Sequence, residues 1–158
     1  MRQLVAAEHP GHGVIGEELG RIRDDAEFVW TIDPIDGTKA FISGIPTFGT
    51  LIALLERGEA VLGVIDQPIS GERWLGVRGR TTKLNGREIG TRACPELGAA
   101  SLFATAPSMF KGDDAAAWDR LGGAVRMVRY GADCYAYGLL AAGDRRAHLA
   151  ASMRLTQA

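Results

Sequence analysis

Four acidic residues near the N-terminus of this 158-residue chain have the types and spacing of a metal site. Glu17 and Glu18 are adjacent, and Asp33 and Asp36 are separated by two residues, with no histidine or cysteine inside either group. Carboxylates without softer ligands suit a hard cation such as Mg²⁺, which keeps several waters and accepts few protein oxygens. Negative charges held together repel one another unless a cation or a proton lies between them. The cluster therefore predicts a magnesium site.

The two residues between the aspartates shape the segment. Pro34 fixes one backbone dihedral angle, which predicts a tight turn after a strand. In such a turn Asp33 and Asp36 converge, with the Ile35 carbonyl between them as another oxygen ligand. A purely structural interpretation is also open, because Asp-Pro and Asp-Gly are common turn pairs and Asp36 would serve equally well as a helix cap.

Gly37 and Thr38 directly follow the second aspartate, at the expected start of a short helix over residues 38–42. Unpaired N–H groups and the helix dipole favour an anion at such a position. A phosphate bound there would contact both the cation and these amides, and the Thr38 hydroxyl would hydrogen bond an activated water. The segment therefore contains the groups needed to hydrolyse a phosphate ester.

Strand and helix patterns surround this cluster. Residues 27–33 predict a buried strand, and residues 1–8 predict an amphipathic helix with Leu4 and Val5 facing inward. Residues 47–56 and 60–66 predict a hairpin joined by residues 57–59. Other strands are expected at 72–77, 83–89 (with the turn pair Asn85-Gly86), 101–105 and 125–130, and other helices at 113–121 and 134–142. The pattern indicates a mixed α and β fold without repeats.

Composition limits the classes of function. The chain is 46% apolar and 23% charged with a formal net charge of −1, which favours one soluble globular domain and disfavours nucleic acid or anionic lipid as a partner. Apolar runs are too short to span a bilayer and no signal-peptide core follows the first residue, so a cytoplasmic protein is expected. Cys94 and Cys134 are expected to be reduced and packed, and His9 and His12 to lie in a solvent-exposed turn.

The combined motifs resemble the paired signatures of the inositol monophosphatase family of Mg²⁺-dependent, lithium-sensitive phosphatases. These motifs are Val-Ile-Gly-Glu-Glu at 14–18 and Trp-Thr-Ile-Asp-Pro-Ile-Asp-Gly-Thr at 30–38. The similarity continues through residues 39–54, 63–68, 72–74, 85–86 and 133–143 and is greatest to the histidinol-phosphatase branch. It implies an α+β fold, the layered α/β sandwich of the carbohydrate phosphatases, in incomplete form.

The resemblance also implies roles by position. The family's metal ligands match Glu17, Asp33, Asp36 and the Ile35 carbonyl, and its phosphate-contacting pair matches Gly37 and Thr38. It implies Mg²⁺ as cofactor and catalytic roles for Glu17 and Thr38. In the family, the counterpart of Thr38 orients the attacking water. The implied reaction is hydrolysis of a small phosphorylated substrate, first histidinol phosphate in histidine biosynthesis and, as the alternative, an inositol or other sugar monophosphate.

Asp133 is the candidate for substrate specificity. The inositol-specific branch tends to carry a small neutral residue there, whereas a carboxylate favours a cationic substrate such as histidinol phosphate. A structural role is equally open, since Asp133 directly precedes the predicted helix at 134–142 and would cap it.

The ends of the chain are expected to differ from the family. Residues 1–143 are predicted to form a partial phosphatase domain and residues 144–158 a divergent, loosely ordered tail. Relatives carry a preceding segment with another aspartate and a following segment with a further carboxylate, so a chain without them would bind metal weakly. A second class of hypothesis is therefore a catalytically inactive fragment or a non-catalytic partner of a complete copy. Relatives are commonly homodimers, which makes a homodimer an expectation here.

Overall fold

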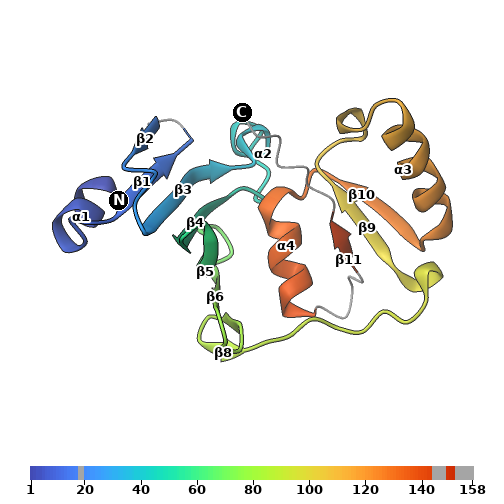
Figure 1. Cartoon of the computed structure of the whole chain (residues 1–158). Coiled ribbons are helices and arrows are strands. Elements are labelled where there is room, and N and C mark those ends of the chain that lie inside the picture. The colour runs from blue at the N-terminus through green and yellow to red at the C-terminus, as the bar shows by residue number, and fades with distance from the viewer. Residues whose placement is uncertain (18–19, 144–148, 152–158) are drawn as a thin grey trace.

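The computed structural model describes residues 1–17, 20–143 and 149–151 (Figure 1). Its helices are α1 (Arg2–Glu8), α2 (Thr38–Ile42), α3 (Asp113–Ala124) and α4 (Asp133–Ala142), with short 3₁₀ turns at Leu97–Ala99 and Pro107–Met109. Its strands are β1 (Gly13–Gly16), β2 (Gly20–Ile22), β3 (Phe28–Asp36), β4 (Gly49–Glu56), β5 (Glu59–Gln67), β6 (Glu72–Val77), β7 (Lys83–Leu84), β8 (Arg87–Glu88), β9 (Ser101–Ala104), β10 (Met127–Tyr130) and β11 (Leu149–Ala151).

Two sheets and the helices between and beside them form the layers. The larger sheet has eight strands in the order β2-β1-β3-β4-β5-β6-β7-β8, antiparallel except for the β1–β3 pair. The smaller sheet, β10-β9-β11, is parallel. Helix α4 lies between the two sheets, and α3 covers the smaller one from the other side (Figure 1). The predicted α+β fold is confirmed. No helix of the described ranges is long and apolar enough to cross a membrane.

Two hairpins of the larger sheet, β4–β5 and β7–β8, close through two-residue turns. Arg57 and Gly58 have φ values of 50° and 84°, and Asn85 and Gly86 have 48° and 81°. Positive φ at both central residues is the signature of the type I′ turn, whose twist matches that of the flanking strands. The predicted hairpin of residues 47–56 and 60–66 is therefore present, with Glu59 in its second strand rather than in its loop. The single strand expected at 83–89 is instead two short strands, β7 and β8, joined by the Asn85-Gly86 turn.

Strand β3 continues through the segment for which the sequence predicts a tight turn. Asp33 pairs with Leu51 and Asp36 with Gly49, so two residues of β3 stand opposite one residue of β4. This is a β-bulge. Pro34 lacks an N–H, the Ile35 N–H donates to Asp33 Oδ1 (3.0 Å), and the Pro34 carbonyl accepts from Thr50 Oγ1 (2.8 Å). Because side chains satisfy these backbone groups, the strand does not need to end there, and the predicted turn is wrong.

The N-terminal helix packs on the larger sheet through one residue and an aromatic stack. Val5 is buried, but Leu4 is 59% exposed, which contradicts its predicted inward position. His12 is half-buried rather than solvent-exposed, because it accepts a hydrogen bond from Trp30 Nε1 (3.1 Å) and stacks on Phe28. Strands β1 and β2 carry no clear alternation in sequence and were not predicted.

Helix α4 rests on β6 through a glycine and two aromatic rings. A Cβ atom at Gly138 would lie 2.7–2.9 Å from ring atoms of Trp74, so the helix approaches the indole as closely as a side-chain-free residue permits. Tyr135 packs edge-on against Trp74 and donates its hydroxyl hydrogen to Glu72 Oε2 (2.7 Å). These contacts hold the middle of α4 in place on the sheet.

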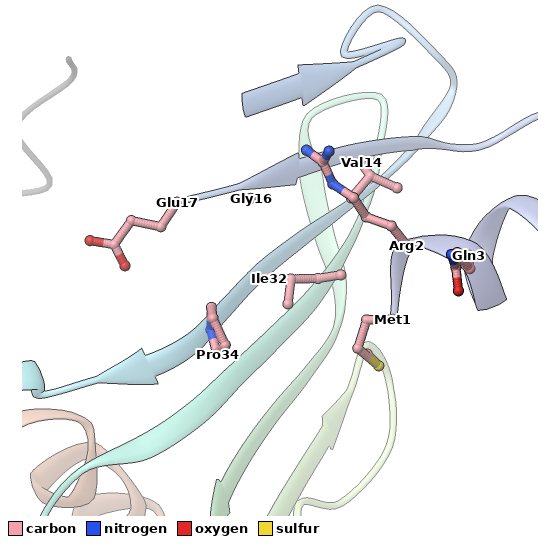
Figure 2. Close-up of a pocket in the computed structure, with 8 residues that line it drawn as sticks. All are labelled: Met1, Arg2, Gln3, Val14, Gly16, Glu17, Ile32 and Pro34. Atoms are coloured by element: carbon pink, nitrogen blue, oxygen red, sulfur yellow. The ribbon is translucent and has the colours of Figure 1, made fainter. Parts of the chain in front are cut away.

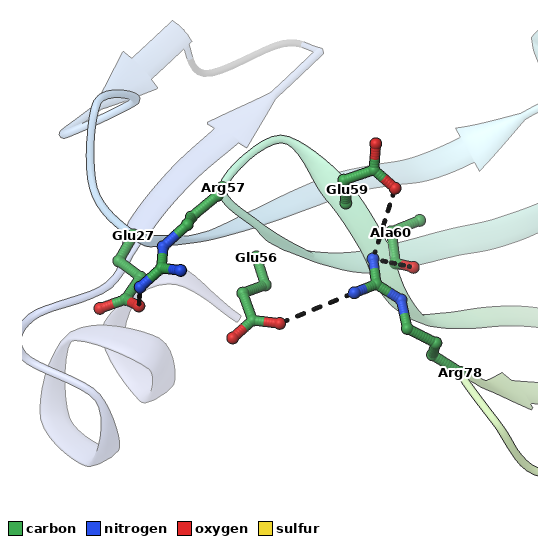
Figure 3. Close-up of polar contacts among 6 residues, drawn as sticks. All are labelled: Glu27, Glu56, Arg57, Glu59, Ala60 and Arg78. Atoms are coloured by element: carbon green, nitrogen blue, oxygen red, sulfur yellow. Dashed lines mark hydrogen bonds and ion pairs between the residues drawn. The ribbon is translucent and has the colours of Figure 1, made fainter.

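Exposed ion pairs connect residues around the β4–β5 turn to Glu27 and Arg78 (Figure 3). Arg78 lies 3.7 Å from a Glu56 oxygen and 3.6 Å from a Glu59 oxygen, and Arg57 lies 2.7 Å from Glu27. Such pairs stabilise a fold by about 0–1 kcal/mol each, because water screens them. Burial of the sheet against α4 therefore contributes more to stability than these charges do.

The predicted tail begins after α4. Gly143 ends the helix in the left-handed conformation (φ 60°), and a Cβ there would collide with the Gly90 carbonyl. Within the tail, Leu149–Ala151 forms β11 and pairs in parallel with β9, so these three residues differ from the expected loose order. Residues 144–148 and 152–158 lie outside the described residues, and the tail remains a prediction for them.

The close contact between Gly138 of α4 and Trp74 leads to a prediction about stability. Gly138→Ala should lower the free energy of unfolding by about 1–3 kcal/mol, because the added methyl group overpacks against Trp74. Gly123→Ala is the matched control, since it lies in α3 with nothing within 4 Å of its Cβ position and should be neutral or stabilising by up to about 1 kcal/mol. Urea unfolding measures both, and equal effects would refute the tight helix–sheet contact.

Candidate metal and phosphate site

Glu17 and Asp33 lie side by side where β1 ends beside β3. The parallel register pairs Gly16 with Ile32, and the Glu17 N–H donates to the Ile32 carbonyl (3.4 Å), which places the two acidic residues at the same level. Burial, a hydrogen bond to Glu17 and the negative charge of Glu17 together raise the pKa of Asp33 to about 6. A carboxyl pair of this kind favours a shared proton or a cation.

Asp36 faces the start of α4. Its Oδ2 accepts a hydrogen bond from the backbone N–H of Cys134 (2.8 Å), across a sequence separation of 98 residues. Helix α4 begins at Asp133 itself, and its N-cap residue is Ala132, which makes no side-chain capping hydrogen bond. Asp133 is therefore not the N-cap residue, and the structural interpretation in which it caps a helix that begins at Cys134 is wrong.

Asp133 instead packs against the backbone of Gly37. A Cβ at Gly37 would lie 2.9–3.0 Å from the Asp133 side chain, and Gly37 itself has a left-handed φ of 80°. Asp133 has a φ of 44°, a conformation that aspartate tolerates better than most residues. Burial and the Asp36 charge raise the pKa of Asp133, whereas Lys39 lowers it. The carboxyl group is therefore held against the loop that carries the other predicted site residues.

The Thr38 hydroxyl and the Ile35 carbonyl are in contact. Thr38 Oγ1 donates to Ile35 O (3.2 Å), and Thr38 is the first residue of α2 and is exposed. Helix α2 begins where the sequence predicted it. Two predicted site atoms thus support one another, and the hydroxyl oxygen still has lone pairs with which to accept a hydrogen bond.

Tyr137 belongs to the same surroundings, although it was not among the predicted site residues. Burial and the negative charge of Asp36 raise the pKa of the Tyr137 phenol. It lies one helical turn after Asp133, so the periodicity of α4 was the one available signal. Cys134 is buried, as predicted, whereas Cys94 is exposed and that prediction is wrong.

The predicted ligands thus form two neighbouring groups rather than one cluster. In the ranges that the structure describes, no three His, Cys, Asp or Glu side chains converge closely enough to hold a metal ion. Glu17 and Asp33 are the converging pair, and Asp36, turned toward α4, acts on Asp33 through its charge. Hard oxygen donors and crowded negative charge fit Mg²⁺ in chemical type. Glu18 lies outside the described residues.

A pocket of about 500 Å³ adjoins Glu17 (Figure 2). Met1, Arg2 of α1, Val14 of β1 and Ile32 of β3 contribute to its lining. Figure 2 shows the Glu17 carboxylate at the edge, directed away from the residues of α1. Glu17 therefore stands at the edge of a largely apolar cavity.

Comparisons with known proteins agree on one family. The family model described as the inositol monophosphatase family matches residues 1–156. The chloroplastic bifunctional phosphatase IMPL2 of Arabidopsis thaliana is 51% identical over 145 residues, which cover 90% of this chain and 42% of that protein. A histidinol-phosphatase of Chlorobaculum parvum is 35% identical over 144 residues, 90% of this chain and 56% of that protein.

A solved structure shows the same fold. An inositol monophosphatase from Zymomonas mobilis superimposes with a TM-score of 0.83 at 46% identity, covering 90% of this chain and 55% of that one. The predicted layered sandwich is therefore confirmed. The chain spans about half the length of the relatives that it matches.

The raised pKa of Asp33 predicts how the stability of the fold depends on pH. Its folded-state pKa of about 6 lies above the ordinary 3.8, so its contribution to stability is complete below pH 3.8 and is lost as the pH rises through 6. Without metal, Asp33→Asn should therefore melt at a higher temperature than wild type at pH 7.5 and at a similar one at pH 4. Thermal melts at both pH values, with the exposed Asp25→Asn as control, measure this; a pH-independent difference would refute it.

Proposed function

Since the chain belongs to the inositol monophosphatase family, we propose that it hydrolyses a small phosphate monoester to an alcohol and inorganic phosphate in a Mg²⁺-dependent reaction. The observation that carries the proposal is the bulge in β3. It presents Asp33 and Asp36 on one face of the strand, next to Glu17 and immediately before Gly37 and Thr38. Negative charge that suits a cation thus lies directly before the N–H groups that would bind a phosphate.

Glu17, Asp33 and Asp36 would hold the cation, together with the Ile35 carbonyl. Asp36 has its Oδ1 for this purpose, because Oδ2 accepts from Cys134. When bound, Mg²⁺ supplies positive charge that neutralises the phosphoryl group and makes water more acidic. The neighbouring negative charges that raise the pKa of Asp33 would then attract the cation. The Glu17–Asp33 pair is therefore suited to a site that holds a cation.

The remaining groups orient the reactants. The N–H groups of Gly37 and Thr38 would bind phosphate oxygens at the start of α2. Thr38 Oγ1, whose hydrogen is directed to Ile35 O, would accept a hydrogen bond from the attacking water, and Glu17 would take the proton of that water. The alcohol leaves opposite the water, so the chain acts mainly by positioning.

Histidinol phosphate is the substrate that we propose first. Its ammonium group would pair with the Asp133 carboxylate, which is held beside Gly37. The names of two similar proteins, a histidinol-phosphatase and a bifunctional phosphatase, are compatible with this substrate. The second candidate is an inositol monophosphate, which the similarity to the Zymomonas mobilis protein favours.

The proposed reaction predicts phosphate release by the purified chain. With Mg²⁺ and histidinol phosphate, wild type should release phosphate, chelation or lithium should suppress it, and Asp36→Asn should lower it by about 10–100-fold. Asparagine keeps an oxygen for the Cys134 N–H, so the variant removes charge while leaving α4 capped. Release no greater than that of Asp36→Asn on every ester tested would instead support the non-catalytic alternative.

Asp133 makes a separate prediction about selectivity. Asp133→Asn should lower kcat/KM for histidinol phosphate about tenfold more than for inositol 1-phosphate, because one charge-assisted hydrogen bond to the substrate becomes neutral. Asparagine also tolerates a positive φ, so the backbone should be preserved. Steady-state kinetics on both esters measure this, and a proportional loss on both would show that Asp133 does not select the substrate.

A further inference from the structure

Gly49 lies at the junction of the metal-site strand and α4. In the β3–β4 register it stands directly opposite Asp36. A Cβ at this position would lie 2.9 Å from Cys134 Sγ and 3.0 Å from the Asp66 carbonyl oxygen. Its φ is not in the left-handed region, so the backbone conformation does not require glycine. What requires glycine is the space occupied by the Cys134 sulfur at the start of α4 and by the Asp66 carbonyl of β5.

Three contacts then fix the first turn of α4. The Cys134 N–H is bonded to Asp36 Oδ2 (2.8 Å), the Cys134 side chain rests on Gly49, and Asp133 rests on Gly37. Cys134 is 3% exposed, so its side chain has little room to turn away from an added group. Burial and the nearby Asp36 raise the pKa of its thiol, which keeps it a neutral packing group.

The rest of α4 cannot absorb a displacement easily. Gly138 is pressed against Trp74 in the middle of the helix, and Gly143 is pressed against the Gly90 carbonyl at its end. A group inserted beneath Cys134 would therefore tilt or lift the first turn rather than move the whole helix. The residue that follows this movement most directly is Asp133, the neighbour of Cys134.

We propose that Gly49 is a positioning residue for Asp133: the absence of a side chain at position 49 lets Cys134 reach Asp36 and so sets where the Asp133 carboxyl lies. The proposal rests on the proposed function for its effect on substrate choice. Its structural half concerns only the Asp36–Cys134 hydrogen bond and can be tested without any substrate.

The first experiment observes that hydrogen bond directly. The chain has two cysteines, so protein labelled with ¹⁵N-cysteine gives two amide signals, and Cys94→Ser identifies the one from Cys134. Gly49→Ala should shift the Cys134 signal toward that seen in Asp36→Ala and speed its hydrogen exchange about tenfold or more, as expected for loss of a hydrogen bond to a charged group. The matched control, Gly63→Ala in β5, has nothing within 4 Å of its Cβ position and should leave the signal in place. An unchanged Cys134 amide in Gly49→Ala would overturn the proposal.

The second experiment asks whether the position of Asp133 follows. Gly49→Ala should lower kcat/KM for histidinol phosphate about tenfold relative to inositol 1-phosphate, in keeping with the cost of a small misplacement. The double variant Gly49→Ala/Cys134→Ala lacks the sulfur that the added methyl group meets. It should restore the ratio of the two kcat/KM values, even if Gly49→Ala alone folds poorly. The proposal would be overturned if Gly49→Ala had the same kcat/KM ratio as the control Gly63→Ala. It would also be overturned if the double variant did not recover the wild-type ratio. Lack of phosphate release by wild type would defeat the proposed function, while the amide signal would still decide the positioning role.

Discussion

Electrostatic repulsion between carboxylates is the constraint on which the site depends. Residues three apart in a regular strand point to opposite faces, so Asp33 and Asp36 would be separated by an uninterrupted β3. The extra residue of the bulge returns both to one face, opposite Leu51 and Gly49 of β4. Burial and mutual charge then make the ionised form of Asp33 unfavourable. The fold maintains this unfavourable arrangement because hydrogen bonds from Ile35 and Thr50 satisfy the backbone of the bulge.

Asp36 links that strand to the far end of the sequence. One carboxylate oxygen holds the first turn of α4, and the other is available to a ligand. The charge on this carboxylate is also felt by Asp33, Asp133 and Tyr137. A cation that neutralises Asp36 would therefore change the electrostatic surroundings of residues on two elements at once. Glycines at 37 and 49 keep the distance between those elements short enough for this coupling.

Local chemistry made most of the elements predictable. Runs of apolar residues predicted the central strands, Asn85-Gly86 predicted its turn, and Gly37-Thr38 predicted the start of α2. The errors arose where long-range contacts decide. His12 is covered by rings from β3, Leu4 is left outside the face formed by Val5, and Asp36 takes the capping role that sequence proximity assigned to Asp133. The bulge was missed because Pro34 predicts a turn unless side chains elsewhere satisfy its neighbours.

The loop that we propose to bind the metal and Asp133 cannot vary independently in this geometry. A larger residue at 49 would displace Cys134, and one at 37 would meet Asp133, so each glycine is needed only while α4 starts where it does. Conversely, a neutral residue at 133 would relieve the repulsion from Asp36 that burial intensifies. Lys39 offsets part of this repulsion, and the cationic group of the proposed substrate would offset more of it.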